Sequence, residues 1–86
     1  MTKNDKLLAR FFSVPRDLTY TELIKILSLF SFEEIKTGKT SGSSVRFIRK
    51  EENIIIRFHR PHGKESIKEY VIKMIVENLK DNDLVK

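Results

Sequence analysis

The chain has 86 residues, of which 40% are apolar and 34% charged, and its net charge is +5. This composition is typical of a folded protein. The length predicts one domain over 1–86, because two separate cores would each be too small to fold alone. No cysteine is present, which excludes disulfides and thiolate chemistry. Because charges interrupt the start of the chain and no apolar run approaches the roughly 18 residues of a membrane span, we expect no targeting segment, no membrane and a cytoplasmic location.

Hydrophobic periodicity predicts two helices in the first third of the chain. Residues 4–12 form a short helix that ends before Pro15, since proline disfavours helical backbone in the residue that precedes it. Thr19 and Glu22 have the spacing of a capping box. Apolar residues then recur at helical spacing, so the second helix is expected to run to about Phe30.

The middle of the chain changes to a period of two, which predicts three strands. A short strand is expected at about 32–36, followed by a loop at 38–43. Apolar and polar residues alternate from 44 to 48 and again over 54–59, as in half-buried strands. A hairpin turn at 50–53 joins the last two strands, although the strongest turn signal, Asn-Gly, is missing.

The last third predicts a helix with Ser66 as its N-cap. Ile72 and Val76 lie off the expected core stripe, and they either widen it or form a small patch for a partner. The order of helices and strands predicts an α+β fold, a three-stranded antiparallel sheet with its helices on one face. The expected core stripe of the last helix comprises Ile67, Tyr70, Val71, Met74, Ile75 and Leu79.

Strand periodicity also predicts which side chains share the outer face of the sheet. A turn at 50–53 that keeps the apolar residues of both strands on the core side fixes the pairing register. It places Arg46 opposite Arg57 and Ser44 opposite His59, with Cβ atoms about 5 Å apart. Two neighbouring arginines are mildly unfavourable unless an anion bridges them, which is a reason to expect phosphate at this position; the alternative is an exposed pair that solvent tolerates.

Positive charge is concentrated in residues 36–64. This segment holds eight basic and two acidic residues, a formal charge of +6, whereas the rest of the chain carries −1. Such clustering attracts polyanions and makes their binding salt-dependent. The alternative is a solvated face that only keeps the protein soluble. Because the remainder is nearly neutral, the pattern favours a polyanion-binding surface.

The glycine-containing loop at 38–43 is only superficially like a nucleotide-binding loop. Glu33 stands where a Walker A motif needs its first glycine, and a strand follows where the phosphate cradle needs a helix. The loop is therefore either a plain turn or a segment that presents Lys39, Ser41 and Ser43 to a sugar–phosphate backbone.

Of the two histidines, His59 ends the last predicted strand and His62 follows it, and the cations Arg60 and Lys64 lie beside them in sequence. Histidine titrates near neutral pH, and RNA cleavage needs a base for the ribose 2′-hydroxyl and an acid for the leaving oxygen. Cations would stabilise the phosphorane charge that develops between them. The alternatives are ordinary surface histidines or, with less support, a metal site. Apart from Glu65, no carboxylate and no third histidine lies close by in sequence, so neither a metal nor a small-molecule cofactor is expected.

From about Pro15 to Leu84 the sequence resembles the HicA toxin family of toxin–antitoxin pairs. The resemblance lies in the Gly-Ser-x-x-x-Phe pattern over 42–47 together with Pro-His-Gly-Lys over 61–64. It implies a fold like the double-stranded-RNA-binding domain and metal-independent cleavage of mRNA. It also implies neutralisation by a cognate HicB antitoxin that covers the site.

One position departs from the family pattern. The commonest form has a catalytic histidine after Gly-Ser, and Ser44 stands there instead. His62 resembles the family-typical histidine of the turn after the last strand, whereas His59 is additional. The predicted register offers a hypothesis, because His59 would place an imidazole beside Ser44 from the neighbouring strand.

The leading prediction is thus an RNA endonuclease with histidine acid–base chemistry. Arg46 and Arg57 would hold phosphates, and Lys39, Arg60 and Lys64 would steer the strand. The alternatives are a non-catalytic RNA-binding protein and a basic module that binds an acidic protein. Most aromatic residues fall on predicted core positions, which favours recognition of the backbone and shape of RNA over base stacking.

Overall fold

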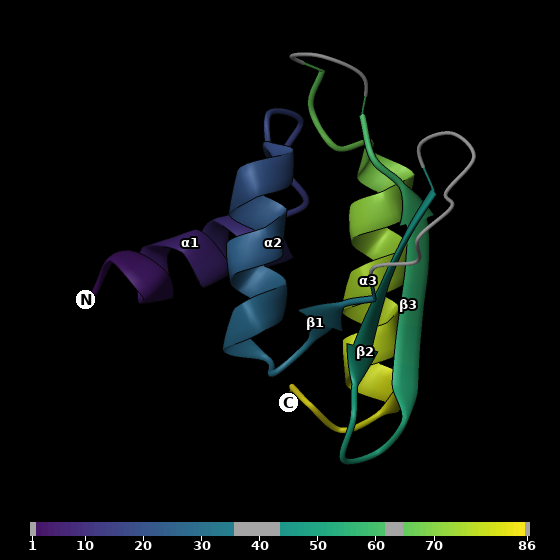
Figure 1. The fold of residues 1–86 in the computed structure, drawn as a ribbon. Helices are drawn as coiled ribbons and strands as arrows, with labels where there is room; N and C mark the ends of the chain where they lie inside the picture. Colours follow the sequence, from purple (N-terminus) through teal and green to yellow (C-terminus); the bar gives the residue numbers. More distant parts are fainter. Residues whose placement is uncertain (1, 36–43, 62–64, 86) are drawn as a thin grey trace.

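The structure, a computed structural model, describes residues 2–35, 44–61 and 65–85. It has the predicted order of two helices, three antiparallel strands and a final helix, which confirms the α+β fold and its likeness to the double-stranded-RNA-binding domain. Figure 1 shows these elements, which are α1 (Lys3–Phe12), α2 (Tyr20–Leu29), β1 (Glu33–Glu34), β2 (Ser44–Arg49), β3 (Ile54–His59) and α3 (Glu69–Asp81).

The sheet has the strand order β1-β2-β3, and its main hairpin has the predicted register. Phe47 pairs with Ile56, so the apolar residues of β2 and β3 share the core side. β1 begins later than the expected residue 32, because the Phe32 N–H donates to the Leu27 carbonyl at the end of α2. The Ile35 N–H then donates to a carbonyl of β2 at 2.8 Å, which continues the pairing beyond the two residues of β1.

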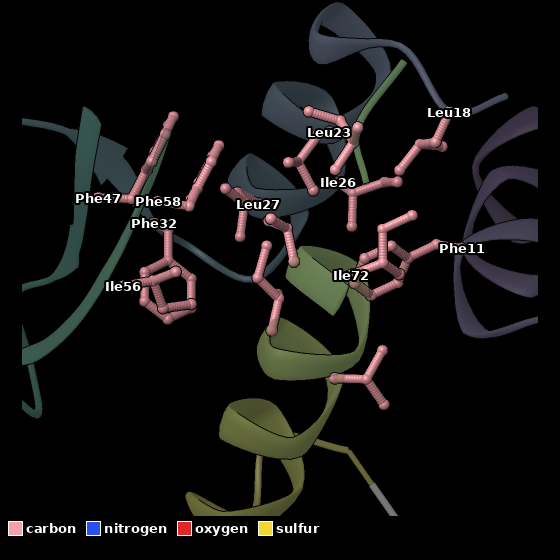
Figure 2. Packing of buried hydrophobic residues seen from close by; sticks show 14 of the residues in the cluster. Phe11, Leu18, Leu23, Ile26, Leu27, Phe32, Phe47, Ile56, Phe58 and Ile72 are labelled. Carbon is pink, nitrogen blue, oxygen red and sulfur yellow. The ribbon is translucent and has the colours of Figure 1, made fainter. Parts of the chain in front are cut away.

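The helices pack against one face of the sheet. In Figure 1, α3 runs behind β2 and β3, and no helix of the described chain covers the front of these strands. Figure 2 shows the sheet on one side of α2 and α3, with α1 on the other side of this helical layer. The outer face of the sheet therefore stays exposed, as predicted.

A dry apolar core fills the space between the sheet and the helices. The Phe47 and Phe58 rings stack with parallel planes and centroids 5.8 Å apart, and Leu27 of α2 lies beside them in the same core (Figure 2). On the far side, Phe11 of α1 packs into the same core. Among the described residues no polar or charged residue belongs to the buried core, and the one buried side-chain oxygen without a partner is the hydroxyl of the half-buried Tyr20.

Both N-terminal helices begin with capping boxes, and only that of α2 was predicted. The Thr19 side chain accepts from the Glu22 N–H, and the Glu22 carboxylate accepts from the Thr19 N–H. Arg10 of α1 donates to the same carboxylate at 2.8 Å and to Asp17 at 2.7 Å, which ties the two helices together. The hydrogen bond from the Thr19 N–H lowers the pKa of Glu22 below its ordinary value, and the Arg10 guanidinium lowers it further. In α1, the reciprocal pair is Thr2 and Asp5.

The predicted start of the last helix is wrong. Ser66 does not cap α3; its N-cap is Lys68, which makes no side-chain capping bond. The Ile67 N–H donates to the Leu18 carbonyl at 2.8 Å, and the Ile67 side chain is buried. This contact holds the chain against the α1–α2 connection, so the helix begins only after it.

The predicted core stripe of α3 is also partly wrong. Tyr70 and Met74 were expected inside, but their side chains are 65% and 38% exposed. Ile72 and Val76 are buried, which confirms the alternative that they widen the core stripe. The buried face of α3 is rotated by about one residue from the predicted stripe, because α3 lies between the sheet and α1. Branched aliphatic side chains fill this space without burying the hydroxyl that Tyr70 would bring.

All three helices end in a residue with left-handed backbone that is not glycine. Val14, Ser31 and Asp83 have φ values of 55°, 65° and 57°. After α2, the Ser31 N–H donates to the Ser28 carbonyl and the Phe32 N–H to Leu27, the two bonds of a Schellman motif. A non-glycine residue at such a position carries a steric cost from its Cβ.

We expect Ser31→Gly to stabilise the fold by about 0.5–1 kcal/mol, because glycine adopts the left-handed backbone without this cost and Ser31 is exposed. Equilibrium unfolding in urea measures the change. Ser28→Gly is the matched control, since the same substitution inside α2 should destabilise by about the same amount. A lower unfolding midpoint for Ser31→Gly would contradict the left-handed helix end.

Candidate nucleic-acid interface

Two cross-strand pairs define the polar part of the outer sheet face. Ser44 pairs with His59 and Arg46 with Arg57, as the sequence predicted. The side chains of Arg57 and His59 are exposed, while Ser44 and Arg46 are half-buried on the more central strand β2. We call these four residues the polar cluster. A phosphate and a neighbouring ribose could contact both pairs at once, because directly opposed side chains lie about 5 Å apart at Cβ.

Part of the predicted basic segment is neutralised within the fold. Arg49, at the hairpin end of β2, contacts the Glu52 carboxylate at 2.6 Å and donates to the Phe30 carbonyl, also at 2.6 Å. Lys50 lies 3.3 Å from Glu33. These two cations brace the hairpin and β1, so they contribute little positive potential at the surface.

The opposite end of the hairpin keeps its positive charge. Within the ranges 2–35, 44–61 and 65–85, no carboxylate lies within ion-pair distance of Arg46, Arg57 or Arg60. His59 stands among these three cations. Among the described cations of the middle segment, those without an acidic partner therefore lie in the polar cluster or, as Arg60 does, directly after it.

The other half of the outer face carries isoleucines, with the exposed Glu33 opposite Ile48 on the β1 edge. Ile48 pairs with Ile55, whose side chain is 48% exposed, and both follow the polar cluster along the strands. Ile35, half-buried, lies beside Arg46 in the pairing of β1 with β2. The uncovered face thus joins a cationic end to an isoleucine end, a combination typical of surfaces that also contact protein.

Sequence reasoning missed the role that Tyr70 can take. This residue lies in the first turn of α3, and it lines a hollow of about 270 Å³ together with His59, Arg60 and Lys68. The helical pattern placed Tyr70 in the core. The only signal against that placement is its hydroxyl, which favours a position with access to water or a partner.

Tyr20 lies on the core side of the sheet, near the end of β3 that carries His59. Its ring packs edge-on against Phe58 at 6.4 Å, and its buried hydroxyl has no hydrogen-bond partner in the part of the chain that the structure describes. Burial raises the pKa of Tyr20; the nearby Glu34 adds to the shift and Arg60 opposes it. Tyr20 stays protonated at neutral pH and supports β3 from the core side.

Several predicted site residues lie outside the described ranges. They are His62 and the RNA-contacting candidates Lys39, Ser41, Ser43 and Lys64, and their roles stay predictions from the sequence. In the three described ranges, no group of three or more histidine, cysteine or acidic side chains has the arrangement of a metal site. Over the same ranges, the helices are too short or too polar to cross a membrane.

Comparison with protein families matches residues 20–84 to the HicA toxin of bacterial toxin–antitoxin systems. The match covers α2, the whole sheet and α3, so it includes the polar cluster and the hollow beside it. It begins at the first residue of α2, and α1 lies before it. Comparison with curated proteins and with solved structures finds no match.

Proposed function

The chain belongs to the HicA toxin family of bacterial toxin–antitoxin systems, and from this premise we propose that it binds RNA and cleaves mRNA without a metal ion. The observation that carries the proposal is the polar cluster. In this cluster His59 pairs with Ser44, the position at which the family usually has a histidine. The neighbouring pair is Arg46 and Arg57, and neither arginine has an acidic partner in the described chain.

His59 is proposed as the acid–base group of the cleavage. In this reaction the ribose 2′-oxygen loses its proton and attacks the phosphorus, and the bond from phosphorus to the 5′-oxygen breaks. The products are a 2′,3′-cyclic phosphate and a 5′-hydroxyl, which receives a proton. The imidazole of His59 is exposed, and an imidazole can serve as proton acceptor or proton donor in such a step. His62 is the sequence-based candidate for the second transfer.

Arg46 and Arg57 are proposed to hold the reacting phosphate. The two residues stand opposite each other on neighbouring strands, and an anion bound by both guanidinium groups would relieve their repulsion. The same charges would stabilise the negative charge that builds up on the phosphorane. Arg60 extends this field past the end of β3, with Lys39 and Lys64 as further candidates from the sequence.

A toxin of this family has a cognate antitoxin as partner. We propose that a HicB-like antitoxin neutralises this chain in the cytoplasm by covering the outer sheet face. Acidic groups would meet the polar cluster, and apolar groups would meet Ile48 and Ile55. A partner bound in this way would exclude RNA sterically and by charge.

Incubation of the purified chain with a long unstructured RNA, with and without EDTA, tests the proposal. We expect fragments in both samples, with 2′,3′-cyclic phosphate ends and no loss of rate in EDTA. Cleavage that EDTA abolishes would contradict the metal-independent mechanism. Binding without cleavage would leave a non-catalytic RNA-binding protein, and no binding at low salt would favour a module that docks an acidic protein.

A further inference from the structure

A hollow between the end of β3 and the start of α3 is the feature that the proposed chemistry leaves unexplained. His59, Arg60 and Pro61 form one wall, and Glu65, Lys68 and Tyr70 lie opposite them. Its volume of about 270 Å³ is just below the roughly 300–1,000 Å³ of pockets for drug-sized ligands. It can take one small planar group and not a large cofactor.

Tyr70 gives this hollow an aromatic wall. Its side chain is 65% exposed, whereas the next most exposed described aromatic residue, Phe12, is 36% exposed and lies on α1. A tyrosine this exposed contributes little to the core. Its ring offers a flat face of the kind on which nucleic-acid bases stack, and each such stack contributes about 1–3 kcal/mol to binding.

The hollow is lined by two cations and one carboxylate, a mixture that suits a base together with its flanking phosphates. The Glu65 carboxylate repels a phosphate, but it can accept a hydrogen bond from the amino or imino group of a base. Arg60 and Lys68, on the two walls, can bind the phosphates that flank the base. Glu69, the other acid near the start of α3, is paired with Arg16 at 3.0 Å.

His59 belongs to both the hollow and the polar cluster. A nucleotide with its base against Tyr70 therefore has its ribose and phosphate beside the imidazole, and the chain of the RNA continues toward Arg57. A base inside a continuous duplex cannot reach such a wall unless it leaves the stack. Unpaired nucleotides reach it without that cost.

We propose that the hollow beside His59 binds one unpaired nucleotide of single-stranded RNA by stacking its base on Tyr70, so that unpaired RNA and not duplex RNA is the substrate. This inference rests on the proposed function, because it assumes that the polar cluster binds RNA. It also revises the prediction from sequence that base stacking plays little part.

The chain contains no tryptophan, so Tyr70→Trp introduces a single fluorescent reporter into the hollow. We expect a single-stranded 2′-O-methyl oligoribonucleotide, which cannot be cleaved by 2′-hydroxyl attack, to quench this emission. A blunt duplex of equal length should leave it unchanged. Phe12→Trp is the matched control, and its emission should not respond to either RNA. Tyr70→Ala should weaken single-strand binding about 10-fold, whereas Met74→Ala, one turn further along α3, should not.

The failure of this inference can be told apart from failure of the proposed function. Anisotropy of a labelled oligonucleotide reports RNA binding independently of the reporter. RNA binding with unchanged tryptophan emission, and an affinity of Tyr70→Ala within about twofold of wild type, would overturn the stacking site while RNA binding stands. Equal quenching by the duplex would overturn the preference for unpaired RNA. Absence of RNA binding by the wild-type chain at low salt would overturn both proposals.

Discussion

Replacing His59 with alanine is expected to lower the rate of RNA cleavage by about 10²–10⁴-fold, the usual contribution of one acid–base group. Because the side chain is exposed at the end of β3 and makes no hydrogen bond with the described residues, the fold should be unaffected. Gel analysis of a defined RNA under single-turnover conditions measures the rate. The free energy of unfolding, obtained from thermal denaturation, should change by no more than about 0.5 kcal/mol, as is usual for surface substitutions.

His59→Gln provides the control for this prediction, since it keeps a polar side chain of similar reach but cannot exchange a proton near neutral pH. It should retain RNA affinity and lose cleavage together with His59→Ala. Ser44→His, in the same background, restores the usual family residue across the strand pair and should recover part of the rate. Cleavage at the wild-type rate by His59→Ala would assign the acid–base role elsewhere, with His62 as the candidate.

Removing both outer-face arginines, Arg46→Ala with Arg57→Ala, is expected to weaken RNA binding about 10- to 100-fold at low salt. Each arginine that contacts a phosphate of a single strand contributes about 0.7 to the slope of log affinity against log salt, so the slope should fall by about 1.4. Titration of labelled RNA at several salt concentrations gives both quantities. The cleavage rate at saturating RNA should fall as well, because the same groups face the developing charge.

A matched double variant separates this effect from a general loss of charge. Lys6→Ala with Lys25→Ala removes the same two positive charges from exposed positions on α1 and α2, on the helical side of the molecule. Its RNA affinity and salt slope should stay close to those of the wild type. If both double variants weaken binding equally, RNA is attracted by net charge alone and the polar cluster is not its site.

The outer sheet face could be predicted from the sequence because strand geometry admits few solutions. Side chains alternate with a period of two, and one buried face fixes the parity of the register. Once Phe47 and Ile56 are assigned to the core, the opposition of Arg46 to Arg57 follows without further information. The capping box of α2 could be predicted for a similar reason, because Thr19 and Glu22 act on their own backbone and need no tertiary contact.

The environment of α3 could not be predicted in the same way. A helix shows which residues share a face, but the packing of other segments decides which face is buried. Here the bond from Ile67 to Leu18 delays the helix start, and α1 covers a second side of α3. Both effects depend on contacts across more than forty residues of sequence. As a result, Ser66 was assigned a cap that it does not form, and Tyr70 was placed in the core.

The opposition of Arg46 and Arg57 also couples the stability of the fold to its ligands. Like charges that face each other across two strands raise the free energy of the empty protein, and a bound polyanion removes this repulsion. A ligand that binds only the folded state at 100 times its dissociation constant adds about 2.7 kcal/mol of stability. For a small domain this is a large share of a total of about 5–15 kcal/mol. Toxin held by its antitoxin, or engaged on RNA, would therefore unfold less often than the empty chain. Proteases that act on unfolded chains would then remove the unoccupied toxin first.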